Sequence, residues 1–516
     1  MQGPVSTGDA APAEKEAIHT GRVIAISVIA ALGGFLFGYD SSVINGANKA
    51  VYYHFQITNT FLQGQTVALA LLASAVGAFV GGRFTDKYGR KKVMVVAAIL
   101  FLIAGIGQAL PFALVDFIFW RLLGGFAIGL AAVVSPMYIS EVAPAHLRGR
   151  LSSLFQLAIV FGIFGTQLVN QVIISLTPNE VENPMMDPRV PPVEANNNLA
   201  LGLEAWQWMF ICMVVPAVVY WVLALTVPES PRYLVAKGDS PAAKEVLEQV
   251  YIGDVSDKLS AIEASLAGEH KMSMSDIKGP KFGLLPIVWI GIILAILQQF
   301  VGINAVFYYS NTIWAAIGFD ESKAFFTSTV ISAVNVIFTF VAIATIDRVG
   351  RKPLLLIGSA GMFVTLGILT LVFMTAPSCT QALIDAGGQS GCTQVSELHT
   401  PILSTSQGWL AVIMLNLYVA FFATTWGPIV WVLLGEMFPN KIRAAAMSVG
   451  VAANWVANYI VSVSFPSLVS IGLGVAYGLF TLGALVSIFY VWKFVKETKG
   501  VQLEDMESLE GVQLAK

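Results

Sequence analysis

Twelve apolar runs, most of them about 20 residues long or longer, set the narrowest limit on how this chain can fold. An α-helix needs about 20 mostly apolar residues to cross a hydrocarbon core about 30 Å thick. Only 12% of the residues are charged, about half the fraction of roughly 25% that is usual in soluble domains. We therefore expect an all-α membrane protein with twelve transmembrane helices. The predicted spans are 22–44, 64–84, 92–112, 115–138, 152–175, 205–227, 283–309, 324–346, 353–375, 408–434, 444–468 and 472–495.

A polar segment divides these runs into two sets of six, and short motifs recur at the same place in each set. GGRFTDKYGRKK at 81–92 returns as ATIDRVGRKP at 344–353, and ISEVAPAHLRGR at 139–150 returns as LGEMFPNKIRAA at 434–445. Two parallel six-helix repeats are typical of transporters whose binding site lies between the halves near the middle of the membrane. Helix-capping signals in the polar segment predict short amphipathic helices. The predicted parts are an N-terminal tail 1–21, a six-helix bundle 22–227, a helical linker 228–281, a second six-helix bundle 282–496 and a C-terminal tail 497–516.

Lys and Arg are distributed unevenly between the two sides of the predicted bundle. If the N-terminus lies inside, the outer loops hold only Lys49, Arg189 and Lys323 of the 29 basic residues, and Arg121 lies within a span. Cytoplasmic loops of membrane proteins carry an excess of Lys and Arg. Both termini are therefore expected in the cytoplasm, in a multi-pass protein of the plasma membrane. The first apolar run begins at Val23 and is long enough to remain as a helix rather than to be a cleaved signal peptide.

Asp40 lies in the stretch GGFLFGYDSSVINGA, residues 33–47, at the end of the first apolar run. A charged side chain in the middle of a membrane helix costs about 2.5–3.5 kcal/mol and usually marks a functional site. At 1.5 Å per residue, Asp40 lies about 27 Å from the inner end of its helix, and Arg121 lies near the outer end of the fourth span. The two charges can meet in the outer half of the membrane, where Asp40 can exchange a proton as Arg121 approaches or leaves. The alternative is a permanent salt bridge that moves no proton.

Amide side chains gather in the seventh span, in the stretch LAILQQFVGINAVFYYSN. An uncharged amide both donates and accepts hydrogen bonds, so a set of amides suits a neutral, polyhydroxylated ligand. A single amide in a span has another explanation, a hydrogen bond between two helices. The candidates from all spans are Gln156, Gln298, Gln299, Asn304, Asn335 and Asn454, with Trp431 and Trp455 as flat faces for a pyranose ring. Gly302 and Gly427 are predicted hinges of an outer gate that involves Tyr308 and Tyr309.

Charged residues of the repeated loops lie where the helices meet the cytoplasm. Asp86 with Arg90, and Glu141 with Arg148 and Arg150, are expected to hold the halves together in the outward-open state and to separate when the halves rock apart. An ion pair near the surface contributes only about 0–1 kcal/mol, so it exchanges readily. The alternative is that these charges only set the topology and cap the helices. The complete predicted network is Asp86, Arg90, Glu141, Arg148, Arg150, Glu229, Arg232, Asp347, Arg351, Glu436 and Arg443.

Cys379 and Cys392 share one polar loop, and a disulfide between them depends on whether that loop faces an oxidising side. The five His residues are scattered without metal-ligand spacing, and no Walker-type phosphate loop is present. We therefore expect no metal, no enzymatic activity and no cofactor, with the proton as coupling ion. The expected partners are a monosaccharide, the proton and the lipid bilayer, without nucleic acid, and one chain is expected to suffice for a transport pathway.

Six motifs carry a resemblance to a known family: RFTDKYGRK at 83–91, SPMYISEVAPAHLRG at 135–149, PESPRYL at 228–234, QQFVGIN at 298–304, DRVGRK at 347–352 and GPIVW at 427–431. Together they resemble the sugar porter family of the major facilitator superfamily, and the resemblance covers roughly residues 22–500. PESPRYL together with QQFVGIN is the most specific part. One departure is Lys496 before Glu497, where the family usually has Pro.

The resemblance implies the major facilitator fold and proton-coupled transport of a monosaccharide. It implies that Asp40 is the proton-coupling residue and that Arg121 modulates it. It also implies a sugar site formed by Gln156, Gln298, Gln299, Asn304, Asn335, Trp431 and Asn454. The cavity would be lined by Phe37, Tyr308, Phe422 and Trp455.

The sequence thus predicts a symporter that imports a hexose, with D-glucose as the first choice, by alternating access. Xylose, galactose or myo-inositol would fit the same amides. The alternatives of other kinds are an uncoupled sugar facilitator, a transporter-like nutrient sensor and a proton-driven drug exporter. The short segment after the last span argues against a sensor, and the amide-rich cavity argues against an exporter.

Overall fold

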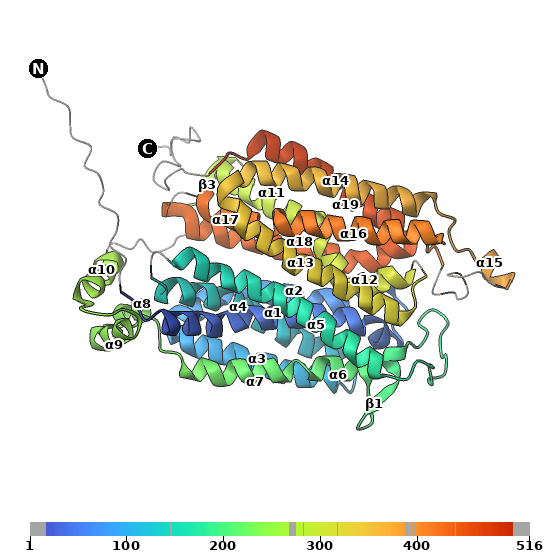
Figure 1. Ribbon diagram of the computed structural model, residues 1–516, viewed down its shortest axis with the longest axis horizontal. Helices are drawn as coiled ribbons and strands as arrows, with labels where there is room; N and C mark the ends of the chain where they lie inside the picture. Colours follow the sequence, from blue (N-terminus) through green and yellow to red (C-terminus); the bar gives the residue numbers. More distant parts are fainter. Residues whose placement is uncertain are drawn as a thin grey trace, which may run out of the picture.

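The computed structural model describes residues 17–144, 147–267, 275–281, 283–316, 318–387, 392, 395, 398–438 and 440–498. Within these ranges, twelve segments are long and apolar enough to cross a membrane, which confirms the predicted number. Six of them precede the linker and six follow it. The two sets form bundles that lie side by side along the length of the molecule (Figure 1). The two predicted tails lie mostly outside the described residues.

The N-terminal half consists of α1 (Thr20–His54), α2 (Thr60–Tyr88), α3 (Arg90–Ala109), α4 (Leu114–Val142), α5 (Arg148–Leu176), α6 (Ala205–Ile211) and α7 (Val214–Thr226). The loop before α6 holds a short 3₁₀ turn, η1 (Glu194–Asn196), and a hairpin of β1 (Asn198–Ala200) and β2 (Leu203–Glu204). The predicted sixth span is two helices, because the chain turns at Cys212 and Met213 before α7 starts. The first helix ends at His54, ten residues beyond its predicted end at residue 44.

The turns of α1 beyond residue 44 contain two polar residues, Asn45 and Asn48. Both amides are buried, at 0% and 1% exposure. Their polar groups are satisfied by the other half of the molecule, so the helix continues where composition alone predicts an end.

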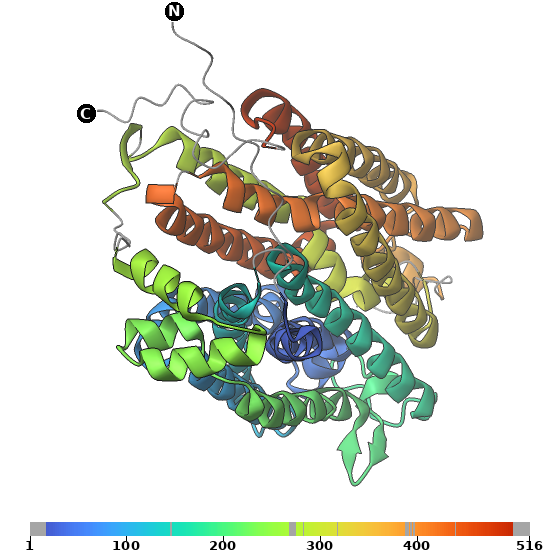
Figure 2. The same ribbon diagram turned by 60° about the vertical axis from the view of Figure 1, so that its left-hand side comes forward.

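The linker between the halves forms three short helices, α8 (Pro231–Ala236), α9 (Ser240–Val250) and α10 (Ser256–Ala267), followed by β3 (Lys278–Lys281). Asp239 caps α9 as its sequence predicts, because its side chain accepts a hydrogen bond from the backbone of Ala242 at 3.2 Å. The three helices lie together against one end of the N-terminal half (Figure 2). We call this end of the molecule the linker end.

The C-terminal half consists of α11 (Pro286–Phe300), α12 (Ile303–Ala316), α13 (Glu321–Val349), α14 (Arg351–Thr375), α16 (Thr405–Thr424), α17 (Trp426–Met437), α18 (Asn440–Ile471) and α19 (Leu473–Phe494). The predicted seventh and tenth spans are each broken into two helices. Gly302 separates α11 from α12 with a φ of 88°, a value that favours glycine. Thr425 separates α16 from α17, two residues before the predicted hinge at Gly427.

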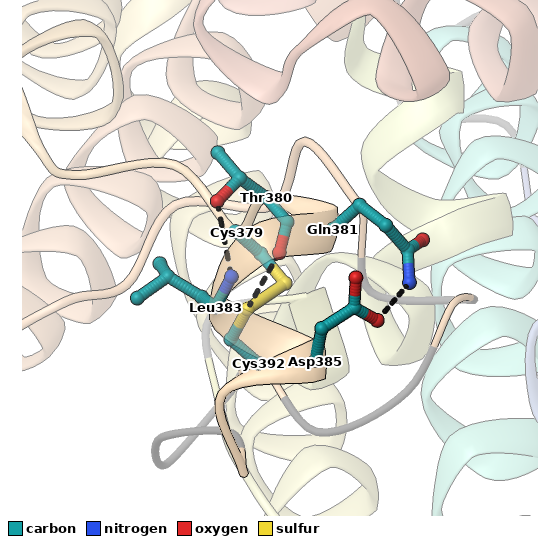
Figure 3. Close-up of a disulfide and its surroundings, with 6 residues drawn as sticks. All are labelled: Cys379, Thr380, Gln381, Leu383, Asp385 and Cys392. Atoms are coloured by element: carbon teal, nitrogen blue, oxygen red, sulfur yellow. Dashed lines mark hydrogen bonds between the residues drawn. A yellow bond between two sulfur atoms is a disulfide. The ribbon is translucent and has the colours of Figure 1, made fainter.

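A disulfide marks the end of the molecule opposite the linker. Cys379 and Cys392 are joined with an S–S distance of 2.08 Å (Figure 3). Between them lies the short helix α15 (Gln381–Asp385), whose first turn is capped by the side chain of Thr380. We call this end, which also carries η1 and the β1–β2 hairpin, the disulfide end (Figure 1).

The most extensive contacts between the two halves pair α1 with α12, α2 with α18, and α5 with α13. The two backbones come close at Gly64 of α2, where a Cβ atom would lie 2.9 Å from the carbonyl carbon of Val463 in α18. Glycine is therefore required at this position for the two backbones to meet.

Candidate functional site

Asp40 and Arg121 lie together inside the N-terminal half, as the depth calculation predicts. Their side chains are 0% and 2% exposed, and Arg121 Nη1 lies 3.7 Å from Asp40 Oδ1. Arg121 also donates to the backbone oxygen of Asp40 at 3.1 Å and to that of Val67 at 3.5 Å. The guanidinium is thus held by two backbone carbonyls as well as by the carboxylate. This arrangement is a buried ion pair with a long direct contact.

A third residue, Gln108 of α3, joins this pair and was not predicted from the sequence. Its Nε2 donates to Asp40 Oδ1 at 3.1 Å, and its Oε1 accepts from Arg121 Nη1 at 3.2 Å. Gln108 is 0% exposed. A polar residue in the apolar run of the third span was the signal that could have identified it, since buried amides need partners.

Four of the predicted sugar-binding amides form one hydrogen-bonded cluster in the C-terminal half. Asn454 of α18 donates to Gln298 Oε1 at 2.8 Å and accepts from Gln299 Nε2 at 3.1 Å. Asn304, at the start of α12, donates to Gln299 Oε1. Gln298 also donates to the backbone oxygens of Trp426 and Gly427, at the break between α16 and α17. The cluster therefore connects both broken helices.

The remaining predicted site residues lie on several other helices. Asn335 of α13 is buried, whereas Gln156 of α5 and Trp431 of α17 are half-buried. Phe422 and Tyr308 are buried, at 9% and 4% exposure.

An aromatic pair of two predicted cavity residues joins the two halves. Phe37 of α1 lies against Trp455 of α18, with ring centroids 5.7 Å apart. Both residues were predicted to line the cavity, and the structure brings them together from opposite halves.

A second polar cluster connects the halves nearer the disulfide end, and it was not predicted. Asn45 of α1 donates to Ser310 Oγ of α12 at 2.8 Å and to Gln167 Oε1 of α5 at 3.1 Å. The backbone nitrogen of Asn311 donates to Asn45 Oδ1 at 3.1 Å, and Ser328 of α13 donates to Asn311 Oδ1 at 2.6 Å. These hydrogen bonds close the disulfide end of the molecule between the halves.

The loop that carries η1 is also tied to both halves. Glu321, the first residue of α13, accepts hydrogen bonds from the backbone of Glu194 at 2.8 Å and of Ala195 at 3.3 Å. Glu204 accepts from His54, Asn196 and Trp206. Burial raises the pKa of Glu204, but these hydrogen bonds outweigh it, so its pKa lies below the ordinary value.

At the linker end, the charges of the N-terminal half form a compact cluster. Arg90 binds Glu141 with two hydrogen bonds of 2.8 and 2.9 Å and lies 3.4 Å from the exposed Asp86. Glu229 accepts from the backbone nitrogens of Arg90 and Lys91 at the start of α3. The partner of Glu141 is therefore Arg90, whereas the predicted partner Arg150 is exposed. Arg90 is nearest because a turn at Gly89, with a φ of 96°, brings the start of α3 against α4.

The C-terminal half repeats the Arg–Glu pair and the glutamate that accepts from the backbone. Arg351 binds Glu436 with two hydrogen bonds of 2.7 and 3.1 Å. Glu497, beyond the end of α19, accepts from the backbone nitrogens of Arg351 and Lys352 at 3.0 Å each. The sequence did not predict this role of Glu497, although Lys-Glu-Thr after the last span matches Pro-Glu-Ser after the sixth.

Among the described residues, each cluster joins elements of one half only. The side chains of Arg148, Asp347 and Arg443 lie outside the described part of the structure. Arg232, in α8, is half-buried. The predicted link between the halves at this end belongs to the opposite conformation, so it stays a prediction.

Comparison with known proteins decides the family. Residues 26–509 match the family described as "Sugar (and other) transporter". The chain belongs to this sugar transporter family. The transporter is 49% identical over 485 residues to the "Glucose transport protein" of Synechocystis sp., with 94% of this chain and 97% of the relative covered. It is 33% identical over 526 residues to the "D-xylose-proton symporter" of Escherichia coli (strain K12), with coverages of 95% and 96%.

Solved structures agree with the fold of this sugar transporter. It is similar to the xylose transporter XylE from E. coli in an inward open conformation, with a TM-score of 0.74 and 32% identity over 94% of this chain and 99% of that one. It is also similar to the proton:xylose symporter XylE bound to 6-bromo-6-deoxy-D-glucose, with a TM-score of 0.71, 33% identity and coverages of 95% and 99%. The major facilitator fold predicted from the sequence is confirmed.

Proposed function

We propose that this transporter is a proton-coupled symporter that imports a hexose, D-glucose first, across the plasma membrane. The observation that carries this proposal is the fully buried carboxylate of Asp40 beside Arg121. Burying an acid at this depth costs free energy, so such an acid usually marks a functional site. A carboxylate that can gain and lose a proton can couple transport to the proton gradient. The 49% identical relative named a glucose transport protein supports the substrate, and the relative named a D-xylose-proton symporter supports the proton.

The sugar is held by the amide cluster of the C-terminal half. Gln298, Gln299, Asn304 and Asn454 present donors and acceptors without a net charge, which fits a neutral polyol. Their mutual hydrogen bonds can be exchanged for bonds to sugar hydroxyls at little net cost. Gln156, Asn335 and Trp431 are proposed to complete the site, and Phe37, Tyr308, Phe422 and Trp455 to line the cavity.

The direction of access follows from where the halves are joined. Hydrogen bonds between α1 and α12 and the contact of α2 with α18 hold the disulfide end closed, while the charge clusters at the linker end are separate in each half. We assign the linker end to the cytoplasm because Lys and Arg concentrate there, and the disulfide end to the outside, where disulfides persist. The structure then corresponds to an inward-facing state.

In the transport cycle, sugar and proton enter from outside and the halves close over them. Closure of the disulfide end forms the hydrogen bonds of Asn45 again. The halves then separate at the linker end, where the sugar leaves. Proton release from Asp40 restores its pairing with Arg121 and prepares the return. The membrane potential drives entry of the proton with about 2.3 kcal/mol per 100 mV.

The test is uptake into proteoliposomes with the Asp40→Asn variant. We expect it to abolish accumulation of glucose against its gradient, while exchange of labelled for unlabelled glucose continues. Asp116→Asn, on the half-buried acid in the first turn of α4, is the matched control. If Asp40→Asn still accumulated glucose against its gradient, Asp40 would not be the coupling residue. If the wild-type protein did not accumulate glucose and its uptake ignored the pH gradient, the protein would be a facilitator. A competition panel with xylose, galactose and myo-inositol distinguishes the substrates.

A further inference from the structure

We propose that Gln108 is a positioning residue that sets the pH at which Asp40 takes up the coupled proton, and that this proton binds at Oδ2. This inference rests on the proposed proton coupling and extends it to a residue outside the resembled motifs. It follows from the hydrogen bonds that Gln108 makes to both members of the buried ion pair.

The amide of Gln108 stands between the two charges and binds both of them. Its nitrogen donates to Asp40 Oδ1 at 3.1 Å and its oxygen accepts from Arg121 Nη1 at 3.2 Å, while the direct distance between the charges is 3.7 Å. A well-formed ion pair between guanidinium and carboxylate has contacts of about 2.7–2.9 Å. Gln108 therefore replaces a direct bond between the ions with two bonds through a neutral group.

The two oxygens of Asp40 are unequal. Gln108 and Arg121 both approach Oδ1, whereas Oδ2 is buried without a hydrogen-bond partner among the described residues. Gly124 of α4 lies against Oδ2, and a Cβ atom there would come within 2.8 Å of it and within 3.0 Å of Gln108 Nε2. The structure thus leaves one oxygen of the acid without a hydrogen bond, beside a residue that adds no side-chain atom.

Few other groups can titrate near this site. Arg121 is the charged side chain that faces Asp40 among the described residues, and the phenols of Tyr308 and Tyr309 on α12 lie within electrostatic reach of Arg121. Arg121 is held by the backbone oxygens of Asp40 and Val67, so it keeps its place when Gln108 is changed. Loss of the Gln108 amide then removes a donor from the ionised acid without a compensating approach of the cation.

The experiment measures the pH profile of proton-driven glucose uptake in proteoliposomes for Gln108→Met and Gln108→Glu. Gln108→Met removes a hydrogen bond to a charged group. The midpoint of its pH profile of uptake should therefore lie about one to two pH units above that of the wild type, a 10- to 100-fold gain in proton affinity. Gln108→Glu is isosteric, and two adjacent carboxylates resist joint ionisation, so its midpoint should also move upward. Glucose exchange at fixed pH reports the amount of folded protein.

Asn416→Met is the control, because it removes a half-buried amide in α16 that donates, among the described residues, to the backbone oxygen of Val412 in its own helix. Its midpoint should equal that of the wild type. Midpoints of both Gln108 variants that match the wild type would overturn the assignment of Gln108 while leaving the proposed symport intact. A wild-type protein whose uptake does not depend on pH would overturn both.

Discussion

The closeness of α2 and α18 at the disulfide end leads to a quantitative prediction for Gly64. A Cβ atom at this position would overlap the backbone of Val463 in the other half, and backbone cannot move aside as the end of a flexible side chain can. Gly64→Ala should therefore destabilise the state in which the disulfide end is closed. In a state open at that end, α2 and α18 are apart and the added methyl group meets no neighbour from the other half.

The size of the effect follows from known costs of overpacking. An extra carbon forced into a packed interface costs about 1–3 kcal/mol. Such a free energy changes the ratio of open to closed molecules by about 5- to 150-fold. Gly82→Ala is the matched control on the same helix, since nothing lies within 4 Å of its added Cβ. Both substitutions gain the same helix propensity of about 1 kcal/mol, which cancels in the comparison.

The assay is the distance between two spin labels at the disulfide end. Phe61, at the start of α2, and Ile471, at the end of α18, are 58% and 65% exposed, so labels on cysteines there disturb little packing. The free Cys212 is replaced by Ser. Gly64→Ala should shift the distance distribution toward longer separations, and Gly82→Ala should leave it unchanged. Identical distributions for the two variants would refute the view that this contact controls closure.

Three further predictions concern the site and the disulfide end. Asn454→Leu leaves the buried amides of its cluster without a partner and should weaken glucose binding about tenfold or more, measured by equilibrium binding with thermal stability as a parallel control. Because the folded-state pKa of Glu204 is lowered, its contribution to stability is present above its unfolded pKa and is lost as the pH falls. Glu204→Gln should therefore flatten the fall in melting temperature between neutral and acidic pH, and an unchanged slope would contradict the role of its hydrogen bonds. Reduction of the disulfide between Cys379 and Cys392 should increase proteolysis near α15 and leave glucose exchange intact, whereas loss of exchange would show that this loop supports the site.

The fold could be predicted from the sequence because its causes are local. Runs of apolar residues give the spans, and the repeated loop motifs give the two halves. The prediction was least accurate where polar residues lie inside helices. Asn45 reads as the start of a loop, yet its partners on α12 make it part of α1.

The site could be predicted only in part, for the same physical reason. The amides of the seventh span share one stretch of sequence, and the structure joins three of them with Asn454. The bridge formed by Gln108 depends on the packing of α3 against α4, which no spacing along the chain reveals. Of the two partners predicted for Glu141, Arg150 is exposed and the side chain of Arg148 lies outside the described part of the structure, whereas Arg90, distant in sequence, binds Glu141.

Glu497 and Thr498 have a practical consequence for anyone who shortens or labels this protein. They follow the last membrane helix, yet Glu497 closes the first turn of α14 and Thr498 donates to Glu436. A chain cut after Val495 would lack both and leave the first turn of α14 uncapped, while a chain cut after Thr498 would keep the cluster. Fluorescent fusions and affinity tags should therefore be joined beyond residue 498.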